Sequence, residues 1–70
     1  MKTPFMHIAC GDRFKTPHSK RDVTCVKVAP TYAKGSTRNA VILLDHTGHP
    51  AKDLGVLISV RDEEIVETSK

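Results

Sequence analysis

The stretch Ala40-Val41-Ile42-Leu43-Leu44 decides the fold that we expect for this chain of 70 residues. Asn39 precedes it, and the turn-forming sequence Asp45-His46-Thr47-Gly48 follows it. Five consecutive apolar residues are too few for three helical turns, and two of them are β-branched, so the stretch predicts a strand and not a helix. A continuous apolar run of this length is typical of a strand that is buried on both faces. We therefore expect residues 40–44 to form the central strand of a sheet, with Val41 or Leu43 as its main core residue.

The chain is long enough for one small domain, which we expect to span residues 1–70. Its three aromatic residues are Phe5, Phe14 and Tyr32, so the core must be built mainly from Val, Ile and Leu. The apolar run Ile8-Ala9-Cys10 is too short for the apolar region of a signal peptide, and no run is long enough to span a membrane. These patterns predict a cytoplasmic protein without a membrane partner.

Four further segments alternate between polar and apolar residues or carry β-branched residues. We expect them to form short strands over residues 13–16, 22–29, 55–61 and 65–68. Pro17 and Pro30 should end the first two, because proline cannot donate a hydrogen bond to a neighbouring strand. The side chains that we expect to face the core from these segments are Phe14, Val26, Val28, Val56, Ile58 and Val60.

The remaining segments predict connections. Residues 1–10 show no clear period, so we expect an irregular lead-in in which Phe5 and Ile8 cap one end of the core. Residues 30–38 have the composition of a flexible hairpin loop. The acidic tripeptide at residues 62–64 is suited to a single 3₁₀ turn.

Five short antiparallel strands in a chain of this size predict an all-β fold, and our first choice is a small five-stranded SH3-like antiparallel barrel. Closure into a barrel would remove the exposed strand edges that invite aggregation. An OB-like barrel is the runner-up. It would place a helix between the third and fourth strands, where residues 46–54 contain Gly48 and Pro50.

Charge is distributed unevenly along the chain. Residues 1–38 carry eight basic and two acidic residues, a net charge of +6, whereas residues 39–70 carry a net charge of −3. Such a dipolar surface can steer an anionic partner, although ordinary solvated charges give the same tally. The residues of the basic half that we expect to contact a partner are Arg13, Lys15, Lys20, Arg21, Tyr32, Lys34 and Arg38.

Two classes of partner fit these residues. The basic region over residues 13–38 could follow the backbone of a nucleic acid, with Tyr32 stacking on a base. Single-strand binders on barrel folds normally present several aromatic rings, and this chain has few, so an acidic protein surface is the favoured partner and nucleic acid is the alternative.

Four residues have the spacing of zinc ligands. His7 with Cys10, and His46 with His49, form two pairs in which both side chains of a turn could reach one ion. Cys25 could substitute for one of them. Nothing in the sequence makes the two turns converge, so we expect no cofactor and keep zinc as an alternative.

The sequence favours a protein that is not an enzyme. The cysteines Cys10 and Cys25 should be free thiols, the first in a loop and the second in a strand, because the cytosol is reducing. No nucleophile signature surrounds either cysteine, no glycine-rich phosphate loop is present, and a chain this short leaves little structure to form a catalytic pocket.

Several short motifs occur in a familiar order, namely Gly11-Asp12-Arg13-Phe14, Val26-Lys27-Val28, Asn39-Ala40-Val41 with a following Leu44-Asp45, and Asp62-Glu63-Glu64-Ile65-Val66-Glu67. In this order, over residues 11–67, the chain resembles small bacteriophage-encoded SH3-like proteins, which are mostly uncharacterised. The resemblance implies a non-catalytic module that binds a larger host or phage protein in the host cytoplasm and modulates a host enzyme such as RNA polymerase. A nucleic-acid-binding barrel is the first alternative, and a small zinc-binding domain is the second.

Overall fold

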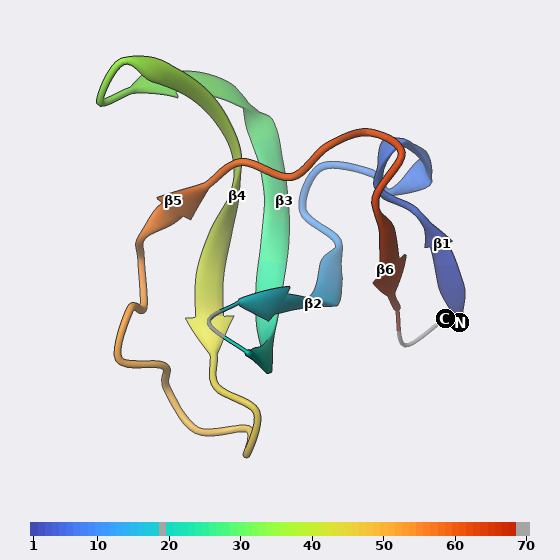
Figure 1. Cartoon of the computed structure of the whole chain (residues 1–70), viewed down its shortest axis with the longest axis vertical. Helices are drawn as coiled ribbons and strands as arrows, with labels where there is room; N and C mark the ends of the chain where they lie inside the picture. Colours follow the sequence, from blue (N-terminus) through green and yellow to red (C-terminus); the bar gives the residue numbers. More distant parts are fainter. Residues whose placement is uncertain (19, 69–70) are drawn as a thin grey trace.

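The fold of this chain is a single antiparallel sheet. The computed structural model describes residues 1–18 and 20–68, and no helix of these residues is long and apolar enough to cross a membrane. Its strands are β1 (Lys2–Pro4), β2 (Arg13–His18), β3 (Arg21–Ala33), β4 (Ser36–Leu44), β5 (Leu57–Ile58) and β6 (Ile65–Glu67), with the 3₁₀ turn η1 (Phe5–His7) after β1. Within the described residues the sheet has the order β1-β6-β2-β3-β4-β5 (Figure 1). The all-β prediction is confirmed.

The sheet is curled, but strand pairing does not close it among the described residues. β1 and β5 form its two edges, and β5 is only two residues long. Other hydrogen bonds hold the chain between β5 and β6 in place. The side-chain amide of Asn39 bonds both backbone groups of Val60, and the backbone N–H of Phe5 donates to the carbonyl of Glu64. The expected strand-paired closure of a barrel is therefore absent in this part of the chain.

The first ten residues are more regular than predicted. β1 pairs with β6 in the register Lys2↔Glu67, Thr3↔Val66 and Pro4↔Ile65, so the sheet has one strand more than the five expected. The prediction failed because three residues are too few to show a period. The expected core role of Phe5 and Ile8 is confirmed, since both side chains are buried.

Both prolines that were expected to end strands lie inside them. Pro17 belongs to β2, in a hairpin whose closing pair is His18↔Arg21. Because hydrogen-bonded positions alternate along a strand, the Pro17 nitrogen faces away from β3. Pro30 lies where the pairing of β3 with β4 shifts register, between Lys27 and Thr31, so it too removes no regular hydrogen bond.

The predicted loop over residues 30–38 is a tight hairpin. β3 ends at Ala33 and β4 begins at Ser36, and these two residues pair with each other. The turn residues Lys34 and Gly35 have φ angles of 50° and 81°. Positive φ at both central positions is the geometry of a type I′ turn, whose twist matches that of the two antiparallel strands it joins.

The face of β3 that packs on the core is the opposite of the one that we predicted. Val23 and Cys25 are buried, whereas Val26 and Val28 are only half-buried. The sequence was misleading here because Lys27 lies on the same face as Val23 and Cys25. A lysine on that face indicated that the face was exposed to solvent. Lys27 is half-buried and its amine donates to the backbone carbonyl of Phe5 in η1.

The central strand has the same reversal. Ala40 and Ile42 are buried, whereas Val41, on the opposite face, and Leu43, where the pairing with β3 shifts register, are half-buried. The expectation that both faces would be buried, with Val41 or Leu43 as the main core residue, is therefore wrong. Periodicity could not distinguish the faces because all five residues of the run are apolar.

The expected strand over residues 55–61 is reduced to β5. Ile58 packs against the core and Val60 is buried, as predicted, but Val56 is 46% exposed. After β5 the backbone N–H of Glu64 donates to the carbonyl of Arg61, so a single turn forms at the acidic tripeptide, but it is not the 3₁₀ turn that we predicted. The strand expected after this turn is present as β6.

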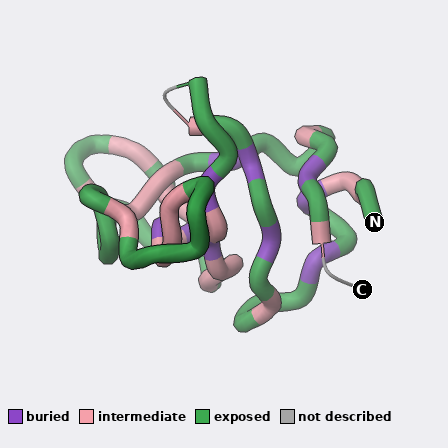
Figure 2. Tube along the Cα trace, turned by 90° about the horizontal axis from the view of Figure 1, so that it is seen from below, coloured by how far each residue is buried: buried purple, intermediate pink, exposed green. Residues whose placement is uncertain are grey.

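The core lies on the inner side of the curled sheet. Along the strands of Figure 2, buried positions alternate with exposed or half-buried ones, as expected for a sheet that is covered on one face. The buried apolar residues are Phe5, Ile8, Phe14, Val23, Cys25, Ala40, Ile42, Val60 and Val66. Both cysteines are free, as predicted, with Cys10 exposed and Cys25 buried.

Candidate functional site

The predicted partner-binding residues separate into two groups, one on β2 and its turn to β3 and the other at the far end of β3. Arg13 and Lys15 lie on β2, and Lys20 and Arg21 lie at the turn from β2 to β3. Tyr32 and Lys34 lie at the other end of β3, in the hairpin with β4. The structure therefore does not gather these residues into one cluster.

Arg38 is engaged within the fold. Its Nε donates to the Ser36 hydroxyl at 2.8 Å and its Nη1 donates to the Leu57 carbonyl at 3.1 Å. These bonds join β4 to the edge strand β5. The arrangement gives Arg38 a structural role within the fold.

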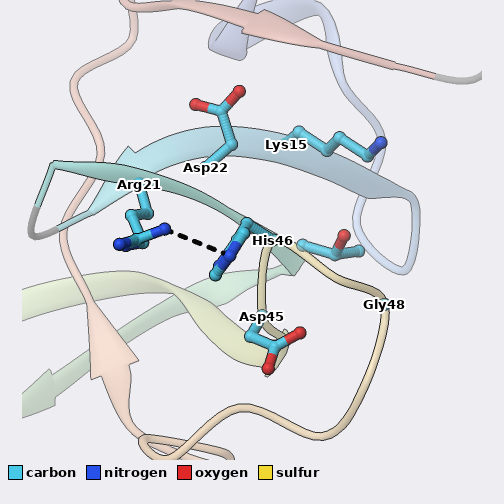
Figure 3. Close-up of a pocket in the computed structure, with 7 residues that line it drawn as sticks. Lys15, Arg21, Asp22, Asp45, His46 and Gly48 are labelled. Atoms are coloured by element: carbon cyan, nitrogen blue, oxygen red, sulfur yellow. Dashed lines mark hydrogen bonds between the residues drawn. The ribbon is translucent and has the colours of Figure 1, made fainter.

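Lys15 and Arg21 line a cavity of about 340 Å³ between β2, β3 and the loop after β4 (Figure 3). The Arg21 guanidinium lies 3.2 Å from Nε2 of His46. Since a guanidinium can only donate, Nε2 accepts in this hydrogen bond. Asp22 and Asp45 line the same cavity, so its charge is mixed.

Asp45 organises the loop that forms one wall of this cavity. Its Oδ1 accepts hydrogen bonds from the Thr47 hydroxyl at 2.6 Å, from the Thr47 backbone N–H at 2.9 Å and from the His49 backbone N–H at 3.0 Å. The Thr47 hydroxyl is the main cause that lowers the pKa of Asp45. An ionised carboxylate therefore faces the same cavity as Lys15 and Arg21, which weakens this cavity as a phosphate site.

The outer face of the sheet carries an apolar row that sequence reasoning missed. The register pairs Arg13 with Val26, Val26 with Val41, and Val41 with Leu57. Paired residues lie on the same face, and the buried neighbours of these residues along each strand point to the core, so this row faces outward. We call Val26, Val41 and Leu57 the outer apolar row. All three are half-buried.

Exposed apolar side chains lie next to the edge strand β5. Leu54 is 55% exposed and Val56 is 46% exposed. Val56 and Leu57 line one pocket beside the edge of the sheet, so apolar surface continues from the outer apolar row to this edge. The row escaped prediction because Val26 and Val41 had been assigned to the core.

Aromatic residues do not form a stacking surface. Phe5 and Phe14 are both 1% exposed and contact each other edge to face, with ring centroids 5.2 Å apart. Tyr32 is 75% exposed, at the hairpin between β3 and β4. One exposed ring is less than single-strand binders on barrel folds normally use.

The four candidate zinc ligands lie on two separate segments. His7 ends η1 and Cys10 lies in the turn that follows, whereas His46 and His49 lie in the loop after β4. His46 bonds Arg21, and Nδ1 of His49 lies 3.0 Å from the Thr47 hydroxyl. Among residues 1–18 and 20–68, no three His, Cys, Asp or Glu side chains form a group that could hold a metal ion.

The thiol of Cys25 is poorly placed for chemistry. Its burial raises its pKa to about 11, and the reactive form of a cysteine is the thiolate.

Comparison with known proteins adds no further candidate, because no family model, no curated protein and no solved structure matches this chain.

Proposed function

We propose that this chain is a non-catalytic protein-binding module that uses the outer face of β3, β4 and β5. The observation that carries the proposal is the outer apolar row, which continues into exposed apolar side chains at the edge of the sheet. An apolar surface of this kind is stabilised when a protein partner covers it, whereas it offers nothing to a phosphate backbone.

An SH3-like barrel is the fold type that we propose. Without β1, the strand order is β6-β2-β3-β4-β5, in which the last strand pairs beside the first of the five. A single turn separates β5 from β6. Both features support the fold that the sequence suggested.

The resemblance to small bacteriophage-encoded proteins extends the proposal to the partner. A module of this kind would act in the cytoplasm of the host and would bind a larger protein, with an enzyme such as RNA polymerase as the candidate. Binding would modulate that enzyme, and the module itself would need neither a catalytic residue nor a cofactor.

Nucleic-acid binding is the weaker reading of the same basic residues. Asp22 and Asp45 share the cavity of Lys15 and Arg21, and Glu67 pairs opposite Lys15. These carboxylates oppose the attraction of a phosphate backbone to β2 and its hairpin.

Affinity capture from host lysate with nuclease present tests the proposal. At about 200 mM salt a backbone binder loses most of its affinity, whereas a packed protein complex survives. We expect one stoichiometric protein to be captured and to be lost with Val41→Glu and with Leu57→Glu, two variants that place a charge on the outer apolar row. Circular dichroism must show that both variants fold.

A contrasting variant separates the two readings. Lys20→Glu with Arg21→Glu leaves the outer apolar row intact, so it should retain a protein partner that docks there. Capture of only nuclease-sensitive material, lost in this double variant and retained by Val41→Glu, would replace the proposal with nucleic-acid binding.

A further inference from the structure

Both turns at the ends of β3 place a lysine in the left-handed backbone region. Lys20 precedes β3 with a φ of 69°, and Lys34 follows it with a φ of 50°. Among the described residues these are the two non-glycine residues with positive φ. Glycine or asparagine would adopt this conformation more readily, so backbone geometry does not explain the choice of lysine. What lysine adds at both positions is a positive charge.

These charges are not neutralised within the described part of the chain. Neither Lys20 nor Lys34 forms an ion pair with a described residue, and the same holds for Arg13 at the β2 end of the outer apolar row. By contrast, Arg61 lies within ion-pair distance of two carboxylates in the turn before β6. The acidic turn thus has its own basic partner. Lys15 lies opposite Glu67, and Arg21 shares its cavity with Asp22 and Asp45, so neither is counted here. The cations that remain for a partner are Lys20, Lys34 and Arg13.

The outer apolar row lies between the two turns. Val26 is on β3 itself, and the row continues across β4 to β5. The surface thus combines an apolar centre with cations at both ends of its long strand and at one end of its cross-strand row. A matching partner would present apolar side chains flanked by carboxylates.

We propose that this face binds an acidic protein segment, which packs its apolar side chains on the outer apolar row and places its carboxylates near Lys20, Lys34 and Arg13. This inference rests on the proposed function and names the chemistry of its partner. A protein segment fits better than a nucleic acid because the centre of the surface is apolar and bases would find a single exposed ring, that of Tyr32.

A synthetic peptide tests the inference without knowledge of the natural partner. The longest dimension of the protein is 30 Å. An extended peptide of about ten residues covers that length, since a strand rises about 3.3 Å per residue. We therefore use a fluorescein-labelled peptide with Leu residues in its middle and Glu residues at both ends, and measure its binding by fluorescence anisotropy at low and moderate salt. The same peptide with Lys in place of Glu, and a thymidine oligonucleotide of similar length, serve as competing probes.

Two substitutions separate charge from backbone conformation. Lys20→Asn and Lys34→Asn remove the charge and install a residue that tolerates positive φ. Each should weaken binding of the acidic peptide about two- to five-fold, as expected for an exposed ion pair, while the midpoint of urea unfolding stays the same or rises. Lys52→Asn is the matched control, because Lys52 is an exposed loop lysine that is not among the residues with positive φ. It should bind like the parent protein.

Several results would overturn the inference. These are failure of the acidic peptide to bind, an equal loss of affinity in Lys52→Asn, unchanged affinity in both turn variants, or preference for the oligonucleotide. If the peptide fails while a lysate protein is still captured in a manner that depends on Val41, the acidic partner is excluded and the protein-binding module stands. If that capture fails as well, the proposed function fails with it.

Discussion

The amine of Lys27 lies 4.5 Å from the centre of the Phe5 ring and donates a hydrogen bond of 3.1 Å to the Phe5 carbonyl. Phe5 in turn packs edge to face on Phe14, so contacts between these three side chains join η1 to β2 and β3. A cation over an aromatic ring is most stabilising where water is partly excluded, and Lys27 is half-buried. This contact explains how a charged residue can occupy the inner face of β3.

Replacing Lys27 with methionine tests this contact. Lys27→Met keeps an unbranched apolar stem and removes both the charge and the donor. We expect the free energy of unfolding to fall by about 1–2 kcal/mol, from the lost cation–π contact and hydrogen bond. Urea denaturation measures this change, and Lys52→Met on an exposed loop is the control. Equal midpoints for the two variants would show that the Lys27 contact does not stabilise the fold.

The buried face of β4 yields a second prediction. Ile42 is 1% exposed and Val41 is half-buried, so truncation of Ile42 should cost more. Ile42→Ala should destabilise by about 2–5 kcal/mol, enough to unfold much of a domain this small. Ile42→Val, expected to cost about 0.5–1.5 kcal/mol, keeps the comparison measurable if the alanine variant does not fold.

Val41→Ala is the matched control for the two Ile42 variants. It removes apolar volume from the outer apolar row and leaves the core unchanged. Its urea midpoint should stay closer to that of the parent protein than the midpoint of Ile42→Ala. The opposite order would mean that the assigned faces of β4 are reversed.

The sequence supported the strand content of the fold more firmly than the orientation of its strands. The run at residues 40–44 identified the central strand, but an unbroken apolar run contains no information on which face is buried. In β3, Lys27 led to the wrong choice of buried face. A lysine can lie on a buried face because its long aliphatic stem packs on apolar residues while its amine reaches a polar partner. The hairpin turn at Lys34 and Gly35 was missed because lysine is uncommon at positive φ.

The candidate site was harder to predict for a related reason. The outer apolar row depends on the register between three strands, and register is a long-range property that residue spacing does not encode. The basic residues were identified from the sequence, but their separation into two groups follows from the length of β3. Asn39 was missed as a contact residue, because nothing local marks an amide that pairs with a distant backbone.

Asn39 is the subject of the third prediction. Its Nδ2 donates to the Val60 carbonyl at 2.7 Å, and its Oδ1 accepts from the Val60 N–H at 2.8 Å. Asn39→Asp retains an acceptor and loses the donor, so it should leave the partly buried Val60 carbonyl without its partner. We expect a loss of about 1–3 kcal/mol and faster hydrogen exchange at the Val60 amide. Exchange at the Ile42 amide, inside β4, is the internal control for global unfolding, and equal acceleration at both amides would contradict a local role for Asn39.

Cys25 gives a fourth prediction, on reactivity and alkaline pH. The pKa of this buried thiol is raised to about 11 from 9.0, so the folded state retains its proton where the unfolded state loses it. The corresponding stabilisation is complete below pH 9 and is lost as pH rises through about 11, a change of about 2–3 kcal/mol. Urea melts from pH 8 to about 11 should show this decline in the parent protein and less of it in Cys25→Ala.

A thiol reagent tests the same burial at neutral pH. Cys10 is exposed and Cys25 is fully buried, so the native protein should react rapidly at one thiol and at both only after denaturation. Cys10→Ser should abolish the rapid reaction. Rapid reaction of that variant would show that β3 opens readily and would contradict the core position of Cys25.

The fifth prediction concerns acid pH and the loop that begins at Asp45. Three hydrogen bonds to one carboxylate oxygen favour its ionised form, and the pKa of Asp45 is lowered chiefly by the Thr47 hydroxyl. A depressed folded-state pKa contributes stability that is present above the unfolded value of about 3.9 and is lost as pH falls through the folded value. Carbon-detected NMR titration should therefore place the midpoint of Asp45 below the ordinary range, and Thr47→Val should move it upward because the strongest donor is removed. Thr47→Ser, which keeps the hydroxyl, is the matched control and should leave the midpoint close to that of the parent protein. If Thr47→Val and Thr47→Ser titrate alike, the hydroxyl is not what holds the carboxylate ionised.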